Sequence, residues 1–294
     1  MQIIAKDLSF TYSEKSASLA NRALKNINLT IDEGDFFGII GHTGSGKSTF
    51  VQLLNGLLRV NKNSGILTVG DYDLTDKKCD FKGLRSKIGM VFQYPEHQLF
   101  AETVFNEVAF GLNNFFKGIT QEEKEKRVRQ ALELVGINYD KYKDVSPFDL
   151  SGGQKRRVAI AGVIVTKPEI LVLDEPVAGL DPKGKKELLT LLHNLKKSIV
   201  KTIIIVSHDM NVISENCNRC AVFNDGEIYD VGTPKEIFSH GEKLVELGLQ
   251  MPVTAFITQE LKNMGIDADN DFTVSDFIRA IEKVFLNEDK GGEQ

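Results

Sequence analysis

A glycine-rich stretch at residues 41–49 constrains this chain more than any other feature. Its sequence, GHTGSGKST, matches the phosphate-binding pattern G-x-x-x-x-G-K-[ST]. The apolar run at 35–40 predicts a buried strand before it, and the apolar spacing at 49–58 predicts a helix after it. In such a loop the backbone N–H groups face a polyphosphate, Lys47 reaches the β- and γ-phosphates, and the Ser48 hydroxyl can bind Mg²⁺. We therefore predict a nucleotide site with these ligands: Gly41, His42, Thr43, Gly44, Ser45, Gly46, Lys47, Ser48 and Thr49.

Composition narrows the class of protein further. The chain has 294 residues, of which 41% are hydrophobic and 26% charged, so it can bury a sizeable core in one large domain with an appendage or in two small domains. The net charge of −5 argues against broad non-specific binding of nucleic acid. The apolar stretch at 158–165 is far short of the ~20 residues that a membrane span needs, and the start of the chain does not resemble a signal peptide. We expect a cytoplasmic protein, either soluble or peripheral to a membrane.

The three cysteines fit a reducing compartment better than a disulfide framework. Cys217 and Cys220 form a C-x-x-C pair, but the sequence has no second pair to complete a zinc site. We expect both to be packed, inert thiols.

Strands and helices are predicted along the rest of the chain from the period of its apolar residues. The predicted strands are 3–8, 23–31, 66–69, 72–74 and a strand ending in a loop at 87–95, and the predicted helices are 103–112, 121–134 and 151–165. Tyr12 precedes the phosphate-binding loop, so it can stack on an adenine ring, but its position fits a buried structural tyrosine equally well.

A second glycine-rich turn, Leu150–Gln154, opens the predicted helix at 151–165. A helix N-terminus with a free hydroxyl and free N–H groups attracts anions. Ser151 also fits an ordinary N-cap. Because the turn lies far from Lys47 in the sequence, it need not act on the same phosphate in the same chain.

Two strands are predicted to end in polar groups that can act on a phosphate. The apolar run at 170–173 ends in Asp174 and Glu175, and the run at 202–206 is followed by His208. Ligands bind at the carboxyl ends of strands in open α/β sheets. Since successive strand residues point to opposite faces, we expect one carboxylate to hold a metal and the other to face the attacking water. Pro176 biases Glu175 towards an extended conformation.

Together these motifs resemble an ATP-binding-cassette ATPase over residues 1 to about 232. Residues 41–49 match the Walker A loop, 170–175 the Walker B strand, 150–154 the family signature, Gln93 the Q-loop, 178–181 the D-loop and His208 the switch histidine. The resemblance implies an α/β P-loop NTPase cassette: a mixed sheet core with an antiparallel β part and a helical signature subdomain at about 94–165. It also implies that Tyr12 stacks on adenine.

The resemblance narrows to the energy-coupling-factor transporters, the vitamin and transition-metal importers of prokaryotes, and to the second of their two paralogous ATPases. It is carried by the stretches 41–46, 91–100 and 146–154 and by the long loop after Tyr12. Val177 departs from the threonine of many cassettes, without consequence for catalysis.

This resemblance implies a mechanism and a set of partners. Two cassettes pair head to tail, so that Ser151, Gly153 and Gln154 act on the ATP of a partner cassette, which is a paralogue rather than an identical copy. Mg²⁺ is held by Ser48, Gln93 and Asp174, while the catalytic groups are Lys47, Glu175, which orients the water, and His208, which contacts the γ-phosphate. The other implied partners are a transmembrane coupling subunit and a substrate-binding membrane subunit, with no nucleic acid. The implied location is the cytoplasmic face of the cell membrane.

Residues 233–286 are predicted to form a C-terminal helical extension, which in this family helps the cassettes to stay paired, and residues 287–294 a disordered tail. Tyr94, Leu99 and Phe100 follow Gln93 in a loop that we expect to be exposed and to contact a membrane subunit. The alternative is that they pack in the core of the helical subdomain.

Two other functions fit parts of this sequence. A soluble cassette ATPase acting on nucleic acid or ribosomes shares the motifs, but such proteins usually carry two cassettes or a long coiled coil, which are absent here. A P-loop kinase does not need the turn at 150–154 and transfers phosphate to an acceptor.

Overall fold

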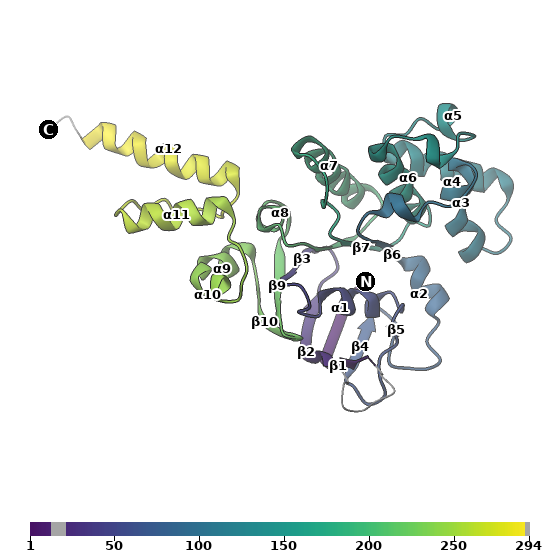
Figure 1. Cartoon of the computed structure of the whole chain (residues 1–294), viewed down its shortest axis with the longest axis horizontal. Helices are drawn as coiled ribbons and strands as arrows, with labels where there is room; N and C mark the ends of the chain where they lie inside the picture. The colour runs from purple at the N-terminus through teal and green to yellow at the C-terminus, as the bar shows by residue number, and fades with distance from the viewer. Residues whose placement is uncertain (13–21, 292–294) are drawn as a thin grey trace.

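The computed structural model describes residues 1–12 and 22–291, and within these residues it contains two β-sheets (Figure 1). One sheet has the strand order β10-β9-β3-β8-β7-β6, and the other is antiparallel with the order β2-β1-β4-β5. The strands are β1 Ile3–Thr11, β2 Arg22–Ile31, β3 Phe36–Gly41, β4 Ile66–Val69, β5 Tyr72–Asp73, β6 Ile88–Val91, β7 Ile170–Asp174, β8 Thr202–Val206, β9 Arg219–Asn224 and β10 Glu227–Gly232. The predicted α/β fold with a mixed sheet and an antiparallel part is confirmed.

The helices lie around these sheets and at the two ends of the molecule. They are α1 Lys47–Leu54, α2 Phe81–Lys87, α3 Val104–Phe115, α4 Gln121–Leu134, α5 Tyr139–Tyr142, α6 Gly152–Ile164, α7 Pro182–Ser198, α8 Met210–Asn216, α9 Pro234–Ser239, α10 Gly241–Glu246, α11 Val253–Asn263 and α12 Val274–Gly291, with short 3₁₀ turns η1 Pro95–Gln98 and η2 Pro147–Asp149. Helices α2, α7 and α8 are not among the elements predicted from the sequence. Helix α1 ends before the predicted residue 58, because Gly56 adopts a φ of 66° that terminates the helix.

The core of the six-stranded sheet positions the phosphate-binding loop. All six residues of β3 are buried, and β3 pairs in parallel with β8 on one side and β9 on the other. Strands β7 and β6 continue the parallel arrangement. The carboxyl ends of β3, β7 and β8 therefore meet at one edge, where the loop 41–46, Asp174 and the segment with His208 follow them.

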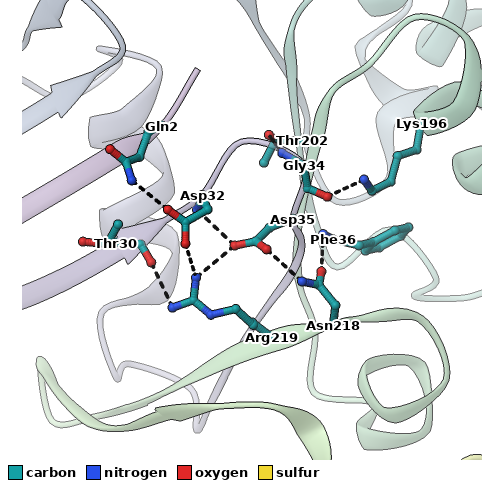
Figure 2. A network of polar contacts seen from close by, with 10 residues as sticks. All are labelled: Gln2, Thr30, Asp32, Gly34, Asp35, Phe36, Lys196, Thr202, Asn218 and Arg219. Atoms are coloured by element: carbon teal, nitrogen blue, oxygen red, sulfur yellow. Dashed lines mark hydrogen bonds and ion pairs between the residues drawn. The ribbon is translucent and has the colours of Figure 1, made fainter.

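A polar network fixes the start of β3 against the neighbouring strands (Figure 2). Arg219 at the start of β9 donates to Asp32 at 2.9 Å and to Asp35 at 3.1 Å. Asn218 donates to the second oxygen of Asp35 at 2.8 Å and accepts from the Phe36 N–H at 2.6 Å. Because Asp35 is only 6% exposed and both its oxygens are bonded, this contact sets the register from which β3 leads to the phosphate-binding loop.

Helices α3, α4 and α6 pack together at one end of the molecule, and α11 and α12 lie side by side at the other (Figure 1). Helix α12 continues through Gly291, so residues 287–291 are helical and not the start of a tail as predicted. Residues 292–294, and residues 13–21 in the predicted long loop after Tyr12, lie outside the described residues.

Candidate nucleotide-binding site

An open cavity of 890 Å³ lies at the carboxyl edge of the six-stranded sheet. It receives side chains from both sheets and from helix α1. Its lining residues are Tyr12, Arg22, Ala23, Lys25, Thr43, Gly44, Gly46, Lys47, Ser48, Thr49, Gln93, Asp174, Glu175, Val206, His208, Asp225 and Gly226. The structure therefore brings most of the predicted nucleotide and metal ligands together in one place.

Lys47 lies over its own loop with its ammonium group bound to backbone oxygens. Its Nζ donates to the carbonyl oxygens of Gly41 and His42, each at 2.7 Å, and the residue is 9% exposed. Burial lowers the pKa of Lys47, while the negative charges of Glu175 and Asp174 act in the opposite direction. Among the described residues, no acidic side chain forms an ion pair with Lys47, so its ammonium group can receive the oxygens of a polyphosphate.

Two glycines let the loop approach its neighbours closely. A Cβ at Gly41, where φ is 150°, would lie 2.3 Å from the carbonyl oxygen of Phe223. At Gly46, where φ is 104°, a Cβ would lie 2.7 Å from the oxygen of Ala23. Side chains at these positions would therefore displace the loop from β9 and β2.

Ser48, Gln93 and Asp174 line the cavity with a hydroxyl, a carboxamide and a carboxylate. Burial raises the pKa of Asp174, and a hydrogen bond from Ser48 and the charge of Lys47 oppose this rise. Oxygen donors of this kind are those that Mg²⁺ prefers, so the set fits the predicted cation. Asp174 ends β7 beside the phosphate-binding loop, where the carboxyl end of the strand places it.

Glu175 follows Asp174 and points towards the switch histidine. Its Oε2 lies 2.8 Å from Nδ1 of His208, and no described donor makes a well-aligned hydrogen bond to that oxygen. The Glu175 side chain is 16% exposed and that of His208 is 73% exposed. The carboxylate is therefore largely withdrawn from solvent and is free to accept a proton or to orient a water.

The predicted extended conformation of Glu175 is wrong. Its φ is 49°, in the left-handed region, although Pro176 follows. The backbone turns here because the Glu175 N–H donates to the Val206 oxygen at 2.9 Å, which keeps Glu175 beside β8 after β7 has ended. A non-glycine residue in this conformation stores strain of the kind found at functional sites.

Tyr12 is 39% exposed at the mouth of the cavity. Its hydroxyl lies 3.0 Å from Oγ1 of Thr49, and its ring meets that of Phe10 edge-on at 5.0 Å. These contacts fix the position of the ring and leave part of its surface exposed, where a base can stack. Tyr12 is therefore not the buried structural tyrosine that its sequence position also allowed.

Several lining residues were not predicted. Arg22 and Lys25 come from β2, and Asp225 and Gly226 form the turn between β9 and β10. The Lys25 N–H donates to the Gly226 oxygen at 2.7 Å, which joins the two sheets at the cavity. The residues 224–226 indicate a hairpin turn in the sequence, but nothing in the sequence brings that turn to the phosphate-binding loop.

Comparison with known proteins identifies the family. The model of the family described as ABC transporter matches residues 24–178. An energy-coupling factor transporter ATP-binding protein EcfA2 of Clostridium perfringens is 46% identical over 288 residues, which cover 98% of this chain and 99% of that protein. A protein of the same name from Caldanaerobacter subterraneus is 48% identical over 266 residues, covering 90% of this chain and 91% of the relative. The chain belongs to the energy-coupling factor transporter ATP-binding proteins.

Solved structures of cassettes agree with this family. The structure of cbiO1 from Clostridium perfringens, described as part of the ABC transporter complex cbiONQ, has a TM-score of 0.71 and 36% identity, covering 87% of this chain and 98% of that one. The cassette MJ0796, solved as a dimer bound to ADP and Pi, has a TM-score of 0.68 and 32% identity over 79% of this chain and 98% of its own.

The signature turn of this cassette does not line the cavity. Ser151 caps α6: its N–H donates to Oε1 of Gln154 at 3.0 Å, and its Oγ accepts from the Gln154 N–H at 3.4 Å. Gln154 also donates to the Tyr142 hydroxyl at 3.0 Å. Ser151 and Gly153 are exposed. The structure therefore leaves this turn free to face another molecule.

The segment after Gln93 divides into exposed and buried residues. Tyr94 and Phe100 are 40% and 59% exposed, as predicted. Leu99 is only 7% exposed and packs in the core with Val104 and Val108, so its predicted exposure is wrong. The reason is that η1 turns the chain, which directs Leu99 inwards beneath α3.

The remaining predictions concern cysteines and membrane spans. Cys217 and Cys220 are free and buried, and burial raises the pKa of Cys220 to about 12, as befits inert thiols. Within residues 1–12 and 22–291, no helix has both the length and the apolar character to cross a bilayer.

Proposed function

We propose that this chain is the ATP-hydrolysing subunit of an energy-coupling-factor ABC importer, which powers uptake of vitamins or transition-metal ions through a membrane subunit. The observation that carries the proposal is the single cavity shared by Lys47, Asp174, Glu175 and His208, with Tyr12 at its mouth. The family of the relatives supports transport rather than the alternative action on nucleic acid or ribosomes.

The loop and Tyr12 bind and orient ATP in this proposal. Backbone N–H groups at the start of α1 and the ammonium of Lys47 receive the phosphates, exchanging the carbonyl contacts of Lys47 for phosphate oxygens. The ring of Tyr12 receives the adenine. Arg22 and Lys25 add positive charge to the same wall of the cavity.

Mg²⁺, when bound, neutralises charge on the phosphates. Ser48, Gln93 and Asp174 supply the hydroxyl, amide and carboxylate oxygens that would hold it. The positive charge of Lys47 favours the ionised form of Asp174, in opposition to burial, which raises the pKa of that carboxyl.

Glu175 orients the attacking water and receives its proton. The carboxylate is mostly buried, which keeps competing bulk water away, and its left-handed backbone holds it at the end of β7. His208 lies beside one carboxylate oxygen, after the end of β8, and contacts the γ-phosphate in this proposal. Phosphoryl transfer depends on such positioning and charge stabilisation more than on covalent chemistry.

A partner cassette completes the site. The exposed turn at Ser151 and Gly153 acts on the ATP of the partner, head to tail, and the partner is a paralogue of this chain. Support comes from the place of this turn on α6, outside the cavity of its own chain. We further propose residues 1–232 as the nucleotide-binding domain and 233–286 as an extension that helps the pair stay together. Exposed Val253, Phe256 and Ile278 on α11 and α12 supply apolar surface for this.

A membrane coupling subunit docks in a groove of 360 Å³ beside η1, which places the chain on the cytoplasmic face of the membrane. Leu57, Phe100 and Phe110 line this groove and are each about half exposed, and the two phenylalanine rings meet edge-on at 4.9 Å. Asn55 also lines it, and its buried Oδ1 has no hydrogen-bond partner among the described residues. This groove therefore suits a segment of the membrane subunit that has apolar side chains and a hydrogen-bond donor for Oδ1 of Asn55.

Purification of the tagged chain from detergent-solubilised membranes of its host tests this function. We expect a second cassette ATPase and a multi-span membrane protein to co-purify, together with ATP hydrolysis that needs no added acceptor. Recovery of ribosomes or DNA-processing proteins without a membrane subunit would leave the ATPase and contradict the transporter.

The docking groove is tested by Phe100→Asp, with Tyr229→Asp on the exposed face of β10 as control. We expect Phe100→Asp to abolish transport while hydrolysis by the separated cassettes persists. Transport at the level of the Tyr229→Asp control would exclude the groove as the docking site.

A further inference from the structure

A buried arginine joins three segments that surround the catalytic carboxylate. Arg156 lies on α6, five residues after Ser151, and is 6% exposed. Its Nε and Nη2 donate to the two oxygens of Glu96, both at 2.9 Å, and form a bidentate ion pair. Glu96 belongs to η1, in the segment that follows Gln93. The pair thus links the signature helix to the Q-loop segment.

The same guanidinium holds the loop after Glu175. Arg156 Nη1 donates to the carbonyl oxygens of Pro176 and Ala178, each at 3.4 Å, and Nη2 also reaches Ala178 at 3.4 Å. Pro176 directly follows Glu175, whose backbone is left-handed, and Ala178 lies two residues after Pro176. A strained conformation persists only where its surroundings determine it, and these contacts are part of those surroundings.

A second contact joins the same two segments. The ring of Tyr94 lies against Gly179, where a Cβ would be 3.2 Å from Tyr94 Cε1. Tyr94 has a left-handed φ of 53° and precedes η1. A movement of η1 therefore reaches the loop 176–179 through the ion pair and through this ring.

Glu96 stands beside the groove as well. Its neighbours Pro95 and Gln98 line the groove, whereas Glu96 itself faces Arg156. Burial raises the pKa of Glu96, but the hydrogen bonds from Arg156 and from backbone outweigh this, and the pKa lies below its ordinary value. The carboxylate is therefore charged at neutral pH and stays paired.

We propose that Arg156 is a positioning residue for hydrolysis. Its contacts with the carbonyl groups of Pro176 and Ala178 fix the orientation of the Glu175 side chain. Its ion pair with Glu96 makes this orientation depend on what occupies the groove beside η1. The first half concerns the cassette alone. The second half rests on the proposed docking of a membrane subunit in the groove.

Paired and single substitutions separate positioning from stability. Removing one member of a buried ion pair leaves an uncompensated charge, whereas replacing both with apolar side chains costs little stability. We therefore compare Arg156→Met, Glu96→Gln and the double variant Glu96→Met/Arg156→Met. The control is Arg129→Met, which removes an exposed bidentate pair with Asp140 in the same helical subdomain. Each is measured in full-length chains paired with the cassette that co-purifies with the wild-type chain, before the membrane subunit is added.

The expected result is a split between catalysis and binding. In the double variant the melting temperature recovers towards that of the wild type and ATP affinity, measured by calorimetry in EDTA, changes less than about threefold. Its kcat stays at least tenfold lower, because the carbonyl contacts are not restored. Glu96→Gln, which keeps the volume, lowers kcat at least threefold with unchanged ATP affinity, and Arg129→Met leaves kcat unchanged. Wild-type kcat in the double variant, or in Glu96→Gln should the double variant not fold, would overturn the proposal.

The dependence of hydrolysis on the groove is measured separately, as the change in kcat when the membrane subunit is added. Addition of the membrane subunit is expected to change kcat of the wild-type cassettes and to change that of the double variant less than twofold. An equal response of both would remove the second half of the proposal. A failure to recover any membrane subunit concerns the proposed function and leaves the kcat comparison in the cassettes intact.

Discussion

Oε2 of Glu175 lies 2.8 Å from Nδ1 of His208, although the two residues follow different strands, β7 and β8. The parallel pairing of Asp174 with Val206 brings the two strand ends together. One residue supplies a largely buried carboxylate and the other an exposed imidazole. This contact places a carboxylate and an imidazole side by side at the carboxyl edge of the sheet.

Glu175→Gln is predicted to nearly abolish hydrolysis while ATP binding persists. The amide keeps the size of the side chain but cannot take the proton of the attacking water, so we expect kcat to fall at least ~100-fold. Phosphate release and ATP binding by calorimetry measure the two effects. Glu123→Gln, which alters an exposed pair with Arg127 on α4, is the control. Turnover near that of the control would remove Glu175 from this role.

Tyr12→Ala is predicted to weaken ATP binding about tenfold, since an aromatic–base stack is worth ~1–3 kcal/mol. Tyr12→Phe loses only the contact with Thr49 and is expected to bind within about threefold of the wild type. Inorganic tripolyphosphate is the control ligand, because it can bind to the phosphate-binding loop but has no adenine base. If Tyr12→Ala weakens the binding of tripolyphosphate as much as the binding of ATP, the ring supports the loop and does not stack on adenine.

Leu99→Asp is predicted to unfold or strongly destabilise the helical subdomain. Leu99 is 7% exposed, and a carboxylate there has no described basic partner, so we expect a loss of more than about 3 kcal/mol. Thermal unfolding measures it against Phe100→Asp, whose side chain is 59% exposed. Equal melting temperatures of the two variants would contradict the buried position of Leu99.

The groups that we propose to bind phosphate could be found from the sequence because each lies in a short stretch of it. The glycines of the loop 41–49 permit the backbone conformation that the loop adopts. The apolar run before Asp174 indicates a strand and places Asp174 at its end. The signature turn is a capping box, which is also local. Helix 121–134 was predicted with its observed bounds because its N-cap and charged first turns are read from neighbouring residues.

Contacts between distant segments could not be predicted in this way. Arg156 meets Glu96 and the carbonyl of Pro176 only once α6, η1 and β7 have packed together. The burial of Leu99 depends on the same packing. The left-handed φ of Glu175 opposes its local preference before proline, so a tertiary contact with Val206 decides it.

Asp209→Asn is predicted to destabilise the chain by about 1 kcal/mol at pH 7, and by less in acid. Asp209 follows His208, caps α8 and forms an ion pair with Lys185 of α7. Burial raises the pKa of Asp209, but the hydrogen bond and charge of Lys185 and the backbone N–H groups of α8 outweigh this and lower it from 3.8.

A carboxyl whose pKa is lowered on folding stabilises the native state above its unfolded pKa, and this stabilisation is lost as the pH falls through the folded-state pKa. Asparagine keeps the helix cap and removes only the charge. Urea unfolding of both proteins at pH 7 and at pH 3 measures the difference. We expect it to shrink at pH 3, because that pH lies below the ordinary carboxyl pKa of 3.8, so the unfolded chain takes up the proton and part of the stabilisation is lost. A difference that is equal at the two pH values would contradict the assignment of this stabilisation to the charge paired with Lys185.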